Sequence, residues 1–223
     1  MATSSSTAEE LIPRMRGRLH VYAFWCALIA AGVLMALAPS GAARTACAVY
    51  GTALCALFAV SALYHRWRWD PRWRPILRRL DHSTIHVFIA ASTTPLAVLV
   101  LDGRLQTFVL ACAWTGALGG IALSLAWIDA PRALVAASYV LVGWAALAAI
   151  PRLPEQLPTV PLLLLAAGAA LYIVGAAVYA VRRPDPWPAV FGFHEVFHGL
   201  VVVAAASHFA AFAGWIVPGG PAT

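Results

Sequence analysis

Seven long stretches of this sequence are almost free of charged residues, and they constrain the fold more than any other feature. They cover residues 20–38, 44–65, 80–101, 105–127, 132–150, 160–181 and 190–216. Each is close to the ~20 residues that a helix needs to cross a bilayer, where lipid offers the backbone no hydrogen-bond partner. We therefore predict an all-α, polytopic membrane protein, with a seven-helix bundle over residues 19–217 between short polar tails at 1–18 and 218–223.

The positive charges predict which way the bundle faces. All fifteen are arginines, and the predicted spans divide them unequally between the two sides. Twelve fall in the N-terminal tail and in the second, fourth and sixth loops, whereas the other side has Arg44, Arg104 and Arg152. Because short cytoplasmic loops hold the excess of positive charge, we expect the N-terminus inside and the C-terminus outside the cell membrane.

Only 11% of the residues are charged, against about a quarter in an ordinary soluble domain. The segment RWRWDPRWRPILRR at 66–79 could suggest a nucleic-acid surface, but arginine and tryptophan also gather where a helix meets lipid headgroups. We expect this segment to contact membrane lipids, and no nucleic acid. The glycines at 116 and 120 predict close helix packing, within the bundle or between subunits; the oligomeric state stays open.

The topology brings several polar residues to one level near the cytoplasmic face. The second span ends at SALYH, which contains Ser61 and His65, and the third span opens with Asp81. The last span begins with HEVFH, which places His194 and His198 in its first turns. Ionisable side chains are costly inside a membrane helix and mark functional sites there, although residues near a helix end also reach the interface without any such role.

His194 and His198 are four residues apart, so on a helix they share a face and can bind one metal ion. Neutral imidazoles suit Zn²⁺, and three histidines plus a water form the usual catalytic arrangement. We predict His65 as the third ligand, with Asp81 orienting the water or taking its proton.

The remaining histidines and Glu195 are not assigned as ligands. His208 lies ten residues beyond His198, about 15 Å further along a helix, which is too far to share the ion. His20 is expected near the headgroups. His82 and His86 turn to other faces, where packing or support of a ligand is expected. Glu195 is rotated by about 100° from His194 around the helix axis, so its side chain need not face the metal.

The HEVFH stretch also matches the H-E-x-x-H signature of zinc metalloproteases. Membrane-embedded proteases of this kind take a third ligand from an L-D-G-like segment, and this chain contains Leu101-Asp102-Gly103. The predicted topology places Asp102 on the outer side and His194 near the inner side, most of a ~30 Å hydrocarbon layer apart. The protease interpretation is therefore rejected.

SALYH, DHSTI and HEVFH followed by ASHF, in this order and within seven spans, resemble the progestin and adipoQ receptor superfamily and in particular its bacterial hemolysin III branch. The resemblance covers residues 18–216. It implies a zinc ion held by His65, His194 and His198, with Ser61 and Asp81 beside it. In the receptor branch these positions are associated with hydrolysis of lipid amides such as ceramide, where the zinc-bound water is the nucleophile and the aspartate its partner.

We therefore expect a zinc-dependent hydrolase of lipid amides or esters that acts in membrane lipid homeostasis. Asp81 would assist the attacking water, and Ser61 would donate a hydrogen bond near the developing oxyanion. Two alternatives stay open: a sensor of membrane lipid state in which zinc is structural, and a channel or cytolysin. A structural site would have a fourth protein ligand, and a channel would need a file of polar residues through the bundle.

Overall fold

The computed structural model describes residues 13–39 and 41–220, and within these ranges seven helices are long and apolar enough to cross a membrane. They are α1 (Arg18–Leu37), α2 (Gly41–Arg66), α3 (Arg74–Val100), α4 (Gly103–Ala126), α5 with a following 3₁₀ turn (Arg132–Ala149), α7 (Thr159–Val181) and α8 with a final π turn (Phe193–Ile216). A short helix, α6 (Leu153–Gln156), lies between the fifth and sixth spans. The predicted all-α, seven-span membrane architecture is confirmed.

The helix boundaries follow the sequence punctuation, with one clear exception. Pro131 precedes α5 and Pro158 precedes α7, where a residue without an N–H donor removes no helical hydrogen bond. The third span was predicted to open at residue 80, and this is wrong: α3 begins at Arg74, with Pro75 in its first turn. The apolar run marks the membrane-embedded length, but the helix itself continues into the arginine-rich segment.

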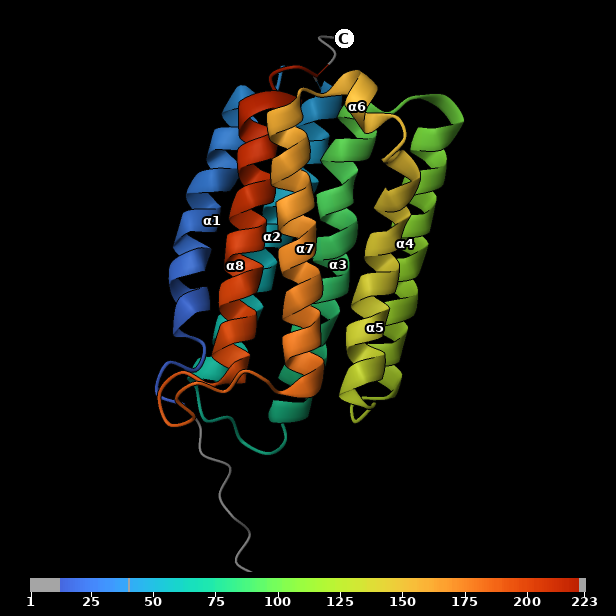
Figure 1. The fold of residues 1–223 in the computed structure, drawn as a ribbon. Coiled ribbons are helices and arrows are strands. Elements are labelled where there is room, and N and C mark those ends of the chain that lie inside the picture. Colours follow the sequence, from blue (N-terminus) through green and yellow to red (C-terminus); the bar gives the residue numbers. More distant parts are fainter. Residues whose placement is uncertain (1–12, 40, 221–223) are drawn as a thin grey trace, which may run out of the picture.

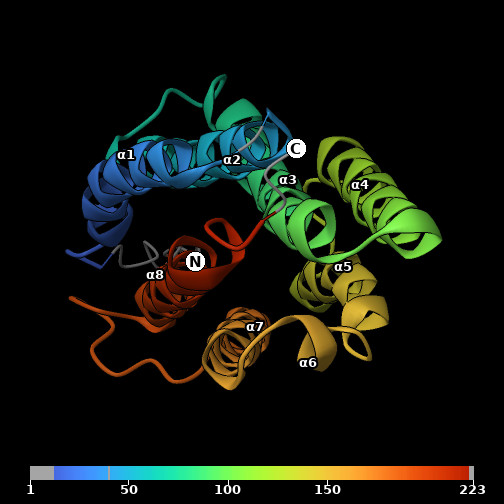
Figure 2. The same ribbon diagram turned by 90° about the horizontal axis from the view of Figure 1, so that it is seen from above.

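The seven spans form a closed ring (Figure 2). Helices that are neighbours in the sequence pack together, α5 packs on α7, and α8 closes the ring by contacting α1. Large apolar side chains such as Trp25, Ile29 and Leu163 point outward and are more than half exposed, as expected of surfaces that face lipid. Tyr50, Phe88 and Phe212 pack inside the bundle.

The predicted glycine contacts lie within the bundle. A Cβ atom on Gly120 of α4 would lie 1.9 Å from the His86 imidazole of α3, and one on Gly116 would lie 3.5 Å from Val142 of α5. Gly120 thus lets a histidine occupy the space between helices, as small residues do in membrane bundles.

The start of α1, the end of α2 and the starts of α3 and α8 lie at one end of the molecule, and the end of α8 lies at the other (Figure 1). We call the first the Arg-rich end, because it contains the loop at 67–73 and the arginines around it. Residues 13–17 were predicted as part of a polar tail, but they pack against the bundle. The Arg14 and Met15 N–H groups donate to the Ala189 and Val190 carbonyls. The rest of that tail, residues 1–12, lies outside the described residues, as do 221–223 of the external tail.

Candidate metal centre

Three histidines from two helices meet at the Arg-rich end. His65 lies in the last turn of α2, and His194 and His198 lie in the first turns of α8. Each offers one ligand atom, and these atoms all lie within 4.8 Å of one another. The His65 and His194 Nε2 atoms are 3.1 Å apart. The predicted grouping of these three residues is therefore present in the structure.

The start of α8 fixes the position of two of these rings. The Gly192 N–H donates to Glu195 Oε2 at 2.9 Å, and the Phe193 N–H donates to Asp185 Oδ1 at 2.8 Å. Two N–H groups of the first turn, which have no partner inside the helix, are satisfied in this way. The register of α8 is thus anchored immediately before His194, so that His194 and His198 turn toward the same neighbour.

Asp81 reaches the cluster from α3. Its side chain is buried, and Oδ2 lies 3.5 Å from His65 Nε2, the nitrogen that also faces His194. Because α3 begins at Arg74, Asp81 lies about two turns inside the helix and does not open it as the sequence analysis expected. Ser61 is also buried, one turn before His65 on α2, and lines the same cavity as Asp81.

His20 of α1 belongs to the same cluster, although the sequence analysis placed it near the headgroups. It is 3% exposed, and its ring stacks on that of His198, with centroids 3.8 Å apart and planes 8° apart. Among the described residues neither ring nitrogen has a hydrogen-bond partner. The sequence does contain a signal for this position. The buried face of α1 consists of residues at helical spacing, two of them alanines, and His20 lies on that face: His20, Ala23, Ala27 and Leu34.

The stacked geometry also bears on whether His20 could bind the same metal ion as His198. A ligand nitrogen approaches a metal ion in the plane of its imidazole at about 2.0–2.1 Å. An ion in the plane of His198 is separated from the plane of His20 by about one stacking distance, so it lies well outside that second plane. In this arrangement, His20 supports the ring of a candidate ligand, His198, and is not itself placed to bind the same ion.

The segment before α1 covers the cluster from outside. Arg16 Nε donates to Glu195 Oε1, and Glu195 is 1% exposed. Gly17 has φ +73°, and a Cβ atom there would lie 2.9 Å from the His65 Cβ. Glu195, to which no role was assigned from the sequence, thus caps α8 and connects the N-terminal segment to it.

Two other polar residues named in the sequence analysis, His86 and Asp102, lie outside the cluster. His86 is fully buried, with its ring nitrogens 3.2 Å from the His82 carbonyl and 3.0 Å from Ser138 Oγ. It links α3 to α5, in keeping with the packing role expected for it. Asp102 precedes α4 at the end opposite the cluster, so the metalloprotease arrangement is absent from the described chain.

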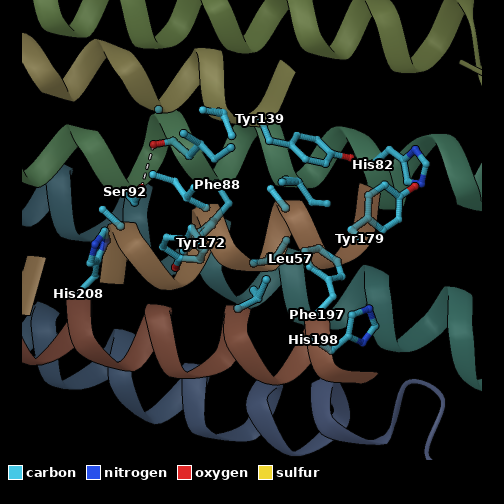
Figure 3. A pocket seen from close by; sticks show the side chains of 18 of the residues that line it. Leu57, His82, Phe88, Ser92, Tyr139, Tyr172, Tyr179, Phe197, His198 and His208 are labelled. Carbon is cyan, nitrogen blue, oxygen red and sulfur yellow. Dashed lines mark hydrogen bonds between the residues drawn. The ribbon is translucent and has the colours of Figure 1, made fainter. Parts of the chain in front are cut away.

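A cavity of about 370 Å³ runs through the bundle from the cluster. Asp81, His82, His194 and His198 line it near the Arg-rich end, and His208 lies at its far end (Figure 3). Between them the wall is mostly apolar, with Leu57, Ile85, Phe88, Ile173 and Val201. Its volume is that of a small-molecule site.

The histidine cluster fits a metal ion. Donors at about 2.0–2.1 Å from one ion are at most about 4.2 Å apart. The closest pair is already at 3.1 Å and the whole set lies within 4.8 Å, so small rotations of the rings bring all three onto one ion. Imidazole nitrogens facing each other also need a shared proton or cation between them. The group can therefore hold a metal ion.

The fold and the cluster together define a multi-pass membrane protein with a candidate three-histidine metal centre at one end of its bundle. Residues 10–209 match the family model described as Haemolysin-III related. The chain belongs to this family.

Named relatives agree with this assignment. The chain is 31% identical to Hemolysin-3 of Bacillus cereus over 182 residues, which is 80% of this chain and 78% of the relative. It is 29% identical to the Hemolysin-3 homolog of Bacillus subtilis (strain 168) over 161 residues, 72% of each chain. It is 25% identical to the human Monocyte to macrophage differentiation factor over 197 residues, 85% of this chain and 78% of the relative.

Proposed function

We propose that the protein is a zinc-dependent hydrolase that cleaves an amide or ester bond of acyl lipids. The observation that carries this proposal is the position of the three-histidine group, beside the buried carboxylate of Asp81 and at one end of a largely apolar cavity. Zinc-dependent hydrolysis of an acyl lipid uses these three features: a site for an electrophilic metal, a group that accepts a proton, and an apolar space for the chain.

His65, His194 and His198 would hold the ion. Imidazole donors in a group of three suit Zn²⁺ and leave a coordination position open. A zinc ion held in this way supplies a Lewis acid for a carbonyl oxygen and acidifies a bound water. Asp81 lies 3.5 Å from His65 Nε2 yet outside the group of ligand atoms, which favours a role in proton transfer over ligation.

Asp81 accepts the proton of the attacking water and delivers it to the leaving amine or alcohol. Its position favours this role, because burial excludes bulk water from the carboxylate while the cavity gives substrate access to it. Ser61 lines the same part of the cavity and donates a hydrogen bond to the developing oxyanion.

The substrate is a membrane lipid. The apolar side chains between His198 and His208 accommodate an acyl chain, while its amide or ester carbonyl lies beside Asp81. The cavity lies among the membrane-spanning helices, at the depth where the acyl chains of a lipid lie.

Purified protein tests this proposal directly. We expect turnover of ceramide or of another acyl amide or ester in mixed micelles, loss of turnover when zinc is removed with a chelator, and recovery when zinc is restored. Sustained zinc binding without hydrolysis of any lipid in such a panel would instead support the second function, a lipid sensor with structural zinc.

A further inference from the structure

The far end of the cavity contains polar groups that the proposed hydrolysis does not use. His208 lies ten residues beyond His198 on α8, about 15 Å along the helix axis, and Figure 3 shows the two rings at opposite ends of the cavity. Tyr172 of α7 also lines the cavity, with its ring centroid 5.4 Å from that of His208. A cavity that only holds an alkyl chain gains nothing from such groups.

The hydrogen bond that His208 makes determines which of its ring nitrogens is free to accept a hydrogen bond from a ligand. Its Nε2 lies 3.2 Å from the Leu165 carbonyl oxygen, and since a carbonyl can only accept, Nε2 carries the proton. In the neutral ring, which is the form that an apolar surrounding favours, Nδ1 is then an acceptor. This Nδ1 is buried and has no partner among the described residues.

The Tyr172 hydroxyl supplies the complementary donor. It too is buried and has no partner in the described part of the chain. The two residues line the end of the cavity, and between them they hold one acceptor and one donor that have no partner among the described residues. A buried polar atom left unpaired costs about 1–3 kcal/mol, so a ligand that satisfies both is favoured over one that satisfies neither.

The position of the imidazole is built into the packing of α7 and α8. A Cβ atom on Gly168 would lie 2.3 Å from His208 Cδ2, so glycine at this position of α7 is what allows the ring to lie against that helix. Without it, the Leu165 contact that fixes the tautomer could not form in the same way.

We propose that His208 and Tyr172 form a second binding site, which recognises a hydroxyl group at the distal end of the acyl chain. A hydroxyl can donate to His208 Nδ1 and accept from the Tyr172 hydroxyl, whereas a methyl terminus can do neither. This inference rests on the proposed function in placing an acyl chain in the cavity, and it narrows the ligand class to hydroxylated acyl chains. A dodecanoyl chain has about the extended length that the ~15 Å separation requires.

The test measures binding of free acids, so it needs no turnover. Dodecanoate and ω-hydroxydodecanoate are titrated into the purified protein in detergent by calorimetry. We expect the hydroxy acid to bind about tenfold more tightly, the equivalent of one or two net hydrogen bonds. His208→Leu and Tyr172→Phe should each reduce that preference at least about threefold. Tyr22→Phe, which alters a tyrosine exposed to lipid, should leave it unchanged.

Equal or weaker binding of the hydroxy acid by the unaltered protein overturns the inference, and so does a preference that survives both substitutions. Thermal unfolding of each variant in the same detergent checks that the bundle is intact. If His208→Leu does not fold, Tyr172→Phe decides the matter, because it removes only an oxygen atom. A preference found in protein that hydrolyses no lipid supports this site while rejecting the proposed function, so the two can fail separately.

Discussion

The imidazole of His20 lies parallel to that of His198, with ring centroids 3.8 Å apart and an interplanar angle of 8°. A residue from the first span thus supports a candidate ligand on the last one, and α1 becomes part of the candidate metal centre although it supplies no candidate ligand. The contact also explains why a histidine occupies the inner face of α1 among small residues.

This contact predicts a graded effect on metal affinity. Because aromatic stacking contributes about 0.5–1.5 kcal/mol, His20→Ala should weaken zinc binding by about twofold to about thirteenfold, whereas His20→Phe should restore most of the affinity. Competition with a chromophoric chelator measures both. Equal affinity in all three proteins would show that His20 does not position the ligand ring.

Asp81→Asn should separate metal binding from chemistry. The substitution keeps the shape of the side chain but removes its capacity to accept a proton, so we expect zinc content to stay unchanged while hydrolysis falls at least about 10²-fold. Asp129→Asn is the matched control, since Asp129 pairs with Arg78 at the same end but is exposed. Turnover that persists in the Asp81 variant contradicts the assigned role.

The ion pair between Arg16 and Glu195 should stabilise the protein more than an exposed pair does. Glu195 is buried and also caps α8, so a double-mutant cycle with Arg16→Ala and Glu195→Gln should give a coupling energy of about 1–3 kcal/mol. The exposed pair Arg152–Glu155 provides the comparison and should give less than about 1 kcal/mol. Similar coupling in the two cycles would mean that the N-terminal segment is not held by this contact.

Two adjacent glycines of α4 allow a controlled test of helix packing. A Cβ atom on Gly120 would overlap the His86 ring, whereas one on Gly119 would meet nothing within 4 Å. We expect Gly120→Ala to lower the free energy of unfolding by about 1–3 kcal/mol, as overpacking usually does, and Gly119→Ala to leave it unchanged or raise it. Thermal unfolding in detergent distinguishes them, and equal effects would contradict the packing described for α3 and α4.

The fold and the grouping of the three histidines could be predicted from the sequence because the signals behind both are strong. Apolar runs give the spans, and alternation of direction brings the end of α2 and the start of α8 to one level, so that His65, His194 and His198 converge. The start of α3 was not predicted correctly, because hydropathy indicates only which residues lie within the membrane. The helical backbone hydrogen bonds extend beyond those residues, and α3 begins at Arg74.

Features that depend on packing between distant segments were not predicted. His20 looks like a headgroup residue by position, and only the three-dimensional arrangement places it on His198. The pairing of Arg16 with Glu195 joins residues 179 positions apart, and no periodicity signals such a contact. The unused hydrogen-bonding groups of His208 and Tyr172 likewise become visible only when both rings line one cavity.

The central claim is that His65 of α2 and His194 and His198 of α8 bind one zinc ion, and the most direct measurement is the zinc content per chain of the purified protein. We predict about one zinc in the unaltered protein and in His82→Ala, whose ring lies outside the ligand group, but far less in His65→Ala and His194→Ala. Full zinc content in both ligand variants would contradict the account.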